Sequence, residues 1–470
     1  MKNCKTCYII CMKKQNQRQK LGNAALSRGK LERQSIVCAE VWREVVKSVW
    51  AANCPADRAL AGSLRDRREA GARDRRFYSE TVFGFFRFWG MIRTLVTEET
   101  AGKIESGKVE KLDSDDEARC LLAANLLAHT PSTLPEAAGL WAKKLGLALP
   151  NVYTPESIGQ AFGSSAFVVD NALPEWVLGR LDRTLTAEKV LAAMMSRPPL
   201  WIRVQTPEVE ALCAGLREQG ITIIRHPLAE NAFAVAETRV NLYTTPEFKR
   251  GWFEIQDLAS QEIGLVCQPK PGERWWDACA GAGGKALQLA ALMERKGSVV
   301  ATDIREYKLE DLKLRARRSG FPNIRTKGWN GKALRPNERY RFDGVLVDAP
   351  CSCSGTWRRN PDGRWTLTIE ELKELTDLQL GILNNAASAV KPGGVLIYGT
   401  CSLFEEENRG VVERFLAANS GFRLDPFPAP LTGEMTNGMV MADGARHNCD
   451  YMFAARFVRE GISPGDSDES

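Results

Sequence analysis

The chain has 470 residues, which at roughly 150 residues per domain suggests two to four domains. Its 44% apolar and 26% charged residues are typical of globular proteins and argue against a largely disordered or fibrous chain. No segment approaches the roughly 18 consecutive apolar residues of a membrane-spanning helix, so an integral membrane protein is excluded.

The net charge of +6 is concentrated at the N-terminus. Residues 1–30 hold eight Lys/Arg and no acid, whereas the other 440 residues carry 56 bases against 58 acids. We expect residues 1–30 to be a basic, disordered arm and residues 459–470 to be an acidic, disordered tail. Thirteen cysteines without an export signal favour free thiols in a reducing cytosol, so we expect a cytoplasmic protein.

Residues 31–190 show a helical pattern. Valines recur at helical spacing between residues 36 and 49, and residues 81–95 form a dense aromatic and aliphatic stripe. Residues 58–76 are rich in arginine, which indicates either a solvated helix face or a surface that contacts phosphates. The polar segment 101–117 predicts a loop between helices.

Residues 196–250 predict a small α/β module. Arg197, Pro198 and Pro199 interrupt the helical pattern. The residues that follow predict a strand at 200–204, a helix at 207–219, a strand at 221–224 and two further short strands before Gly251.

Residues 251–458 alternate regularly between strands and helices. We predict strands at 275–278, 298–303, 342–348 and 395–400, and helices at 285–295, 305–319 and 369–390. Such alternation predicts a parallel sheet with helices on both faces and ligands at the carboxyl ends of the strands.

A glycine-rich loop follows the first of these strands, with the sequence Asp277-Ala-Cys-Ala-Gly-Ala-Gly-Gly-Lys285. Glycines allow close approach of the backbone to a ligand, and the following helix N-terminus offers free amides. Asp303 ends the next strand, where a carboxylate can bind ribose hydroxyls. This pattern also fits a dehydrogenase, so the pattern by itself does not identify the cofactor.

Two cysteine motifs narrow the range of reactions that this site could catalyse. Asp348-Ala-Pro-Cys-Ser-Cys-Ser-Gly355 follows one strand, and Thr400-Cys401-Ser402 ends another. A single cysteine is usually a small buried apolar residue, but two on polar loops at neighbouring strand ends are candidates for catalysis. We therefore select Cys351 and Cys401, and expect Cys353 to be structural or incidental.

At these residues the chain resembles the RsmB/Sun (Fmu) branch of the RNA cytosine-carbon-5 methyltransferases. The matching stretches are residues 277–285, Asp303, 342–362 and 391–408, and residues 251–261 resemble the lead-in to the catalytic domain. Residues 57–95 resemble the NusB-like RNA-binding domain of the bacterial ribosomal-RNA branch. The resemblance implies an α/β fold: a Rossmann-like class I S-adenosylmethionine-dependent methyltransferase domain at 251–458, an all-α NusB-like domain at 31–190 and the small α/β module between them.

The resemblance also implies roles for individual residues. Cys401 matches the nucleophile that adds to carbon 6 of cytosine, Cys351 the cysteine that assists product release, and Asp348 the aspartate that touches the base. Thiolate addition makes chemical sense, because it turns the ring into an enamine whose carbon 5 can accept a methyl group. The implied cofactor is S-adenosylmethionine. Its implied contacts are Cys279, Ala280, Gly281, Ala282, Gly283, Gly284, Lys285, Asp303, Asn330 and Asp348.

Two residues depart from the family pattern. Ala282 replaces a proline, so the glycine loop loses a rigid φ angle, and Asn330 stands where an aspartate usually lies near the adenine.

RNA is the implied partner, and local charge supports it. Residues 305–341 hold twelve Lys/Arg against four acids, and Arg358 and Arg359 follow the Pro-Cys loop, where we predict RNA contacts. The alternative interpretation is a solubilising helix face. Because a stacked base cannot meet Cys401, the target should be a flipped or unpaired cytosine.

The implied substrate is small-subunit ribosomal RNA. Transfer RNA, a catalytically idle RNA-binding factor and a DNA cytosine methyltransferase are the alternatives. We expect no metal, no membrane association and a monomer.

Overall fold

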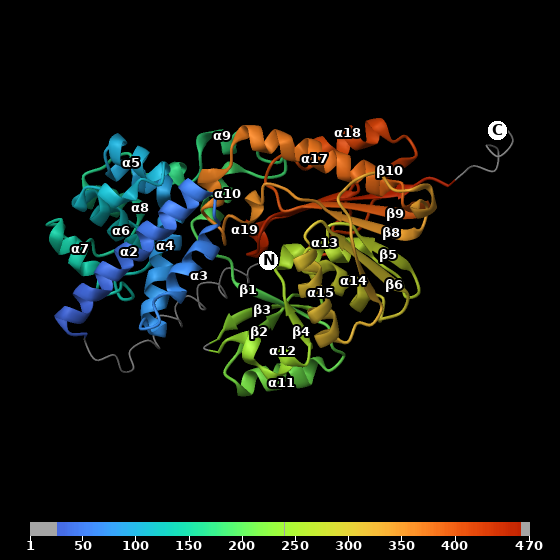
Figure 1. Ribbon diagram of the computed structural model, residues 1–470, viewed down its shortest axis with the longest axis horizontal. Helices are drawn as coiled ribbons and strands as arrows, with labels where there is room; N and C mark the ends of the chain where they lie inside the picture. Colours follow the sequence, from blue (N-terminus) through green and yellow to red (C-terminus); the bar gives the residue numbers. More distant parts are fainter. Residues whose placement is uncertain (1–25, 239, 462–470) are drawn as a thin grey trace.

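The computed structural model describes residues 26–238 and 240–461. A helical region and a larger α/β region lie side by side, and a small sheet packs beneath the latter (Figure 1). Most of the predicted basic arm and acidic tail fall outside the described residues. No helix in the described ranges combines the length and apolar character that crossing a bilayer requires.

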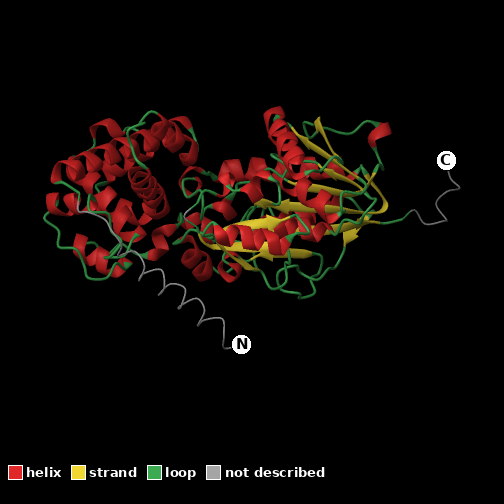
Figure 2. Cartoon of the chain, turned by 90° about the horizontal axis from the view of Figure 1, so that it is seen from below, coloured by secondary structure: helices red, strands yellow, loops and turns green. Residues whose placement is uncertain are grey.

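The front of the chain is all-helical, as predicted, and Figure 2 shows it as a lobe without strands. Its aromatic stripe forms the core: Trp42, Phe85 and Trp89 are fully buried, and Trp42 packs edge-on against Phe85 with ring centroids 5.1 Å apart. The principal helices of this lobe are α2 (Arg28–Ala52), α3 (Ala56–Arg65), α4 (Ala72–Ile92), α5 (Glu98–Glu105), α6 (Ser114–Ala128), α7 (Ala138–Lys144) and α8 (Pro155–Phe162).

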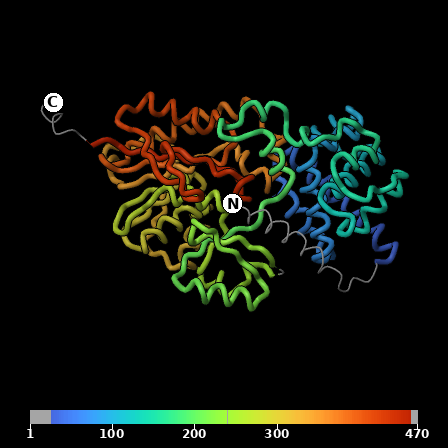
Figure 3. The backbone as a smooth tube through the Cα atoms, turned by 180° about the vertical axis from the view of Figure 1, so that it is seen from behind, coloured from blue at the N-terminus to red at the C-terminus, as the bar shows by residue number. Residues whose placement is uncertain are grey.

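The connecting segment, residues 172–194, carries the short helices α9 (Glu175–Leu178) and α10 (Ala187–Met194). It runs between the two lobes (Figure 3). Its apolar side chains share a core with Trp357, Phe404 and Tyr451 of the large α/β region. A domain boundary at residue 190 therefore crosses a packed core.

The small module forms a four-stranded antiparallel sheet in the order β2-β3-β1-β4. Its strands are β1 (Leu200–Val204), β2 (Thr222–Arg225), β3 (Ala232–Glu237) and β4 (Phe253–Ile255), with helices α11 (Val209–Glu218) and α12 (Pro246–Lys249). Among the residues described between β2 and Gly251, β3 is the only strand, so the prediction of two strands there was wrong. The second strand, β4, comes after Gly251.

The large sheet has the order β10-β12-β9-β8-β5-β6-β7, with β11 paired to β12. Strands β5 to β9 are parallel, whereas β12 runs antiparallel to β9. The strands are β5 (Arg274–Asp277), β6 (Ser298–Asp303), β7 (Ile324–Gly328), β8 (Phe342–Asp348), β9 (Val390–Thr400), β10 (Phe422–Leu424), β11 (Met439–Ala442) and β12 (Met452–Arg459).

Helices cover both faces of this sheet, which confirms the predicted Rossmann-like α/β architecture. One face packs against α13 (Leu258–Cys267), α14 (Gly284–Leu292) and α15 (Glu306–Ser319). The other packs against α17 (Ile369–Ala387) and α18 (Arg409–Ala418). The carboxyl ends of β5, β6, β8 and β9 consequently meet at one edge.

The predicted loop at 101–117 was wrong. Helix α5 begins before it with the side chain of Thr97 capping the Thr100 amide, and it buries Ala101 and Ile104. Helix α6 begins at Ser114 after the Asp113 cap. The Thr97 cap and a few buried residues sustain α5, and the polar residues 114–117 are the first turn of the largely apolar helix α6. The connection between the two helices is thus confined to residues 106–113.

Candidate active site

The loop between β5 and α14 closely approaches the strand ends. Gly281 and Gly283 have φ angles of 52° and 88°, a region that side chains disfavour. A Cβ atom at Gly283 would lie 2.4 Å from Cγ of Leu312 on α15. Glycine is therefore required at position 283 of this turn.

Asp303 sits beside this loop at the end of β6. Its carboxylate accepts a hydrogen bond from the Gly281 amide at 2.9 Å and forms an ion pair with the Arg305 guanidinium at 2.9 Å. Although burial alone would raise it, these hydrogen bonds hold the pKa of Asp303 below its usual value. The aspartate is therefore ionised and positioned to accept hydrogen bonds.

A cavity of about 600 Å³ opens between these groups. Its walls include Gly281, Asp303, Asn330, Asp348 and Cys401, which thus all lie around one space. Asn330 reaches the cavity wall, and its side-chain oxygen accepts the Lys332 amide at 3.3 Å. Six of the predicted cofactor residues line the cavity, namely Cys279, Ala280, Gly281, Asp303, Asn330 and Asp348. The other four, Ala282, Gly283, Gly284 and Lys285, follow in the same loop and the start of α14 and are not part of its lining.

Asp277 is a residue that the sequence did not single out. It is fully buried at the end of β5, and neither of its carboxylate oxygens has a hydrogen-bond partner. Burial raises its pKa to about 7, with Asp348 contributing. An orphaned carboxylate next to a glycine cradle and the Asp303 acceptor fits S-adenosylmethionine, which carries cationic groups and a ribose.

Lys285 links the cofactor loop to the base-binding side. Its buried ammonium contacts the Asp348 carboxylate at 2.8 Å. Although burial alone would lower it, the negative charge of Asp348 raises the pKa of Lys285. Lys285 therefore stays charged, and its contact fixes the Asp348 side chain at the end of β8.

Cys351 and Cys401 lie together because β8 and β9 are adjacent parallel strands, with Asp348 opposite Gly399. Their Sγ atoms are 3.3 Å apart, and the Cys401 amide donates to Cys351 Sγ at 3.3 Å. Both thiols line the cavity. Cys351 and Cys401, the two candidates chosen from the sequence, thus lie in one cluster.

Cys353 joins this cluster, contrary to the expectation that it is incidental. The three sulfurs all lie within 4.8 Å of one another, and no other group of metal-ligating atoms this close occurs in the described part of the chain. Hydrogen bonds shared among the thiols raise the pKa of Cys351 and Cys401 and lower that of Cys353. These hydrogen bonds thus favour the thiolate at Cys353 and the protonated thiol at Cys351 and Cys401. The spacing of the three sulfurs would also suit a soft metal ion.

Glu407 ties the two cysteine loops together, and sequence analysis missed it. Its buried carboxylate accepts the Ser352 amide at 2.8 Å, the Ser352 hydroxyl at 2.5 Å and the Ser402 hydroxyl. The Gln379 amide from α17 donates to it at 2.8 Å. Burial raises the pKa of Glu407 and the four donors oppose that shift. Ser352 and Ser402 follow Cys351 and Cys401 directly, so this carboxylate fixes both thiols.

The predicted RNA contacts at Arg358 and Arg359 were wrong. Arg358 is 2% exposed, and its guanidinium donates to protein oxygens, including the carbonyls of Gly444 and Cys449. Arg359 is paired with Asp257 and, at 2.9 Å, with Asp450. Arg358 braces the interior, because each of its three guanidinium nitrogens already has a partner. Arg359 is partly exposed, and its Nε and Nη2 are engaged by the two carboxylates.

Much of the arginine cluster in the front helices is also bound internally. Arg75 donates to three backbone carbonyls, those of Leu64, Arg67 and Ala70, and Arg67 pairs with Glu44 at 2.6 Å. Arg76 pairs with Glu80 at 2.8 Å. These contacts favour the interpretation of the cluster as a helix surface held by local pairs.

The glycine cradle, the Asp303 carboxylate at the end of β6 and the sheet order fit an S-adenosylmethionine-dependent methyltransferase. Residues 264–458 match the family model described as 16S rRNA methyltransferase RsmB/F. Residues 173–241 match the ferredoxin-like domain of RsmF/B-like methyltransferases, which corresponds to the connecting segment and the small sheet.

Two curated relatives are similar to this chain over about three fifths of its length. The chain is 31% identical over 301 residues to a Synechocystis protein named "Probable ribosomal RNA small subunit methyltransferase B", covering 61% of this chain and 67% of the relative. It is 32% identical over 298 residues to ribosomal RNA small subunit methyltransferase B of Klebsiella pneumoniae, covering 61% and 66%. The chain therefore belongs to the RsmB/F methyltransferase family, and the match spans about two thirds of these relatives.

Solved structures agree with this assignment. The crystal structure of PH0851 superposes with a TM-score of 0.69 at 25% identity, over 89% of this chain and 98% of that one. A methyltransferase homologue from Pyrococcus horikoshii gives a TM-score of 0.50 at 29% identity, over 58% and 90%.

Proposed function

We propose that the protein methylates carbon 5 of a cytosine in small-subunit ribosomal RNA through a covalent bond between Cys401 and carbon 6. The observation that carries this proposal is the placement of two thiols 3.3 Å apart on the wall of the cofactor cavity. The names of the relatives support ribosomal RNA as the substrate.

The residues divide the chemistry among them. S-adenosylmethionine, when bound, supplies an electrophilic methyl group. Cys401 loses its proton to water in the open cavity, and its thiolate adds to carbon 6, which makes carbon 5 nucleophilic. Asp348, held by Lys285, hydrogen-bonds the base and stabilises the enamine. After methylation a base removes the carbon-5 proton, the bond between Sγ and carbon 6 breaks, and Cys351 assists this release.

The substrate class can be tested with purified protein and methyl-labelled S-adenosylmethionine. Unmodified small-subunit ribosomal RNA, transfer RNA and a DNA duplex serve as parallel substrates, and bisulfite sequencing locates the product. We expect one methylated cytosine in the ribosomal RNA. Methylation of transfer RNA or DNA alone would replace the proposed substrate, and cofactor binding without transfer to any of the three would favour a non-catalytic RNA-binding factor.

Replacing Asp303 with alanine should weaken S-adenosylmethionine binding by about 2–4 kcal/mol, allowing about 1–3 kcal/mol for each lost hydrogen bond to a charged group. RNA affinity should hardly change. Calorimetry measures both, and Asp311→Ala on the exposed face of α15 is the matched control. Unaltered cofactor affinity in Asp303→Ala would remove this residue from the site.

Glu407→Gln should slow methyl transfer roughly 10- to 100-fold, because an amide cannot accept all four hydrogen bonds and 1.4 kcal/mol corresponds to tenfold. Cofactor affinity and the KM for RNA should stay near the wild-type values, since Glu407 touches neither. Glu406→Gln, at a neighbouring position paired with Arg180, is the control. A loss of cofactor binding together with rate would indicate general unfolding rather than positioning of the thiols.

A further inference from the structure

A second cavity, of about 360 Å³, lies between the small sheet and the helices of the large α/β region. Residues from β1, β3, α13 and α14 line it, and it shares no lining residue with the cofactor cavity. Its volume falls within the range of roughly 300–1,000 Å³ found for small-ligand sites. Nothing in the proposed methylation uses it.

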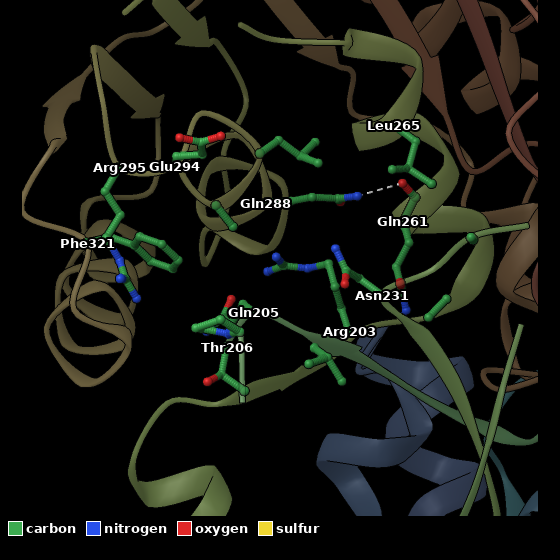
Figure 4. Close-up of a pocket in the computed structure, with 16 residues that line it drawn as sticks. Arg203, Gln205, Thr206, Asn231, Gln261, Leu265, Gln288, Glu294, Arg295 and Phe321 are labelled. Carbon is green, nitrogen blue, oxygen red and sulfur yellow. Dashed lines mark hydrogen bonds between the residues drawn. The ribbon is translucent and has the colours of Figure 1, made fainter. Parts of the chain in front are cut away.

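Arg203 is the charged residue at the bottom of this cavity. It is 2% exposed, and Figure 4 shows its guanidinium pointing among the lining side chains. Its Nε donates to Gln256 at 2.7 Å, and Nη2 makes one long contact, 3.5 Å, with the Gly284 carbonyl. A guanidinium has five N–H donors, so most of those on Arg203 have no strong acceptor among the described residues.

The carboxylate opposite Arg203 in the small sheet, that of Glu254, is already paired with other arginines. Glu254 lies opposite Arg203 in the β1–β4 register, so both side chains leave the sheet on the same face. Glu254 is buried and pairs with Arg315 at 2.9 Å and with Arg318. Two guanidiniums thus occupy this carboxylate, and Glu254 acts on Arg203 only through its charge, without a hydrogen bond.

The cavity wall adds positive charge instead of compensating for it. Arg295 lines the opposite side and lies over the Phe321 ring, 5.3 Å from its centroid. The one acidic lining residue, Glu294, pairs with Lys296 at 2.7 Å. Burial lowers the pKa of Arg203 to about 10, which still leaves it charged at neutral pH.

A buried guanidinium without a directly paired anion costs several kcal/mol, so an arrangement of this kind is stable when a counter-ion completes it. We propose that this cavity is a binding site for a phosphate group, held by the Arg203 guanidinium. The phosphate belongs either to the RNA backbone or to a small phosphorylated molecule. The site is separate from the methyl-transfer centre, and the proposal does not depend on cytosine methylation.

Thermal unfolding with inorganic phosphate tests the site directly. Wild-type protein should melt at a higher temperature as phosphate is added, compared with chloride at the same ionic strength. Arg203→Met should lose this rise, and in chloride it should melt no lower than wild type because the unpaired charge is gone. Arg217→Met, on the exposed face of α11, is the control and should keep the rise.

Three results decide the proposal. Absence of a phosphate-specific rise in wild type would overturn it, and so would a rise that persists in Arg203→Met. If Arg203→Met does not fold, Arg203→Lys takes its place and should keep part of the phosphate-induced rise in melting temperature. If Arg203→Lys also fails to fold and the wild type shows no such rise, Arg203 has a structural role alone.

RNA binding at several salt concentrations distinguishes the two sources of phosphate. If RNA occupies the site, Arg203→Met should reduce the slope of log affinity against log salt by about one. An unchanged slope with a lost phosphate rise assigns the site to a small phosphorylated molecule. Neither measurement requires methyl transfer, so failure here is distinguishable from failure of the proposed function.

Discussion

Cys401→Ala should abolish methyl transfer, with a fall in rate of roughly a thousandfold or more, since no covalent bond to carbon 6 can form. The same variant should form no protein–RNA adduct on a denaturing gel. Transfer of labelled methyl groups and the gel assay measure the two effects. The variant should retain its affinity for S-adenosylmethionine, because Cys401 lines the cavity at the thiol cluster and is not one of the expected cofactor contacts.

Cys353→Ser is the informative control for this experiment. Cys353 is exposed and lies in the same cluster, so it is the one neighbouring thiol besides Cys351 that could compete for the nucleophile role. We expect it to retain adduct formation and turnover. A loss as large as that of Cys401→Ala would show that Cys353 is the nucleophile.

Cys351→Ala should instead trap the reaction after the covalent step. The Cys351 sulfur is 3.3 Å from both the sulfur and the amide nitrogen of Cys401, which places it where it can assist proton transfer during release. Turnover should fall to a single event per protein molecule, and a slow-migrating protein–RNA band should accumulate. If the adduct appears with Cys401→Ala and never with Cys351→Ala, the roles are reversed and the mechanism is of the DNA type.

The sequence predicted the catalytic sheet well because its strands are short, apolar and regularly spaced. The predicted bounds of the strands 200–204, 298–303 and 342–348 agree with β1, β6 and β8. The position of functional residues at strand ends then followed from parallel topology. This is why Asp303, Asp348 and the two cysteines converge on one cavity as expected.

Burial and long-range pairing could not be predicted in the same way. Arg358 and Arg359 appear as an exposed basic pair in the sequence, but their acceptors come from residues about 90 to 160 positions away. Glu407 is one of three consecutive glutamates, and only the fold distinguishes it from its partly exposed neighbours. Local charge does not reveal which side chain of a run faces the interior.

The release of tritium from carbon 5 of cytosine tests most directly which atom of the base is methylated. Ribosomal RNA labelled with tritium at that carbon is incubated with the protein and S-adenosylmethionine, and released tritium is compared with methyl groups incorporated. The proposed mechanism predicts one tritium released for each methyl group transferred, and neither with Cys401→Ala. Methyl incorporation without tritium release would contradict it, because the methyl group would then be on another atom.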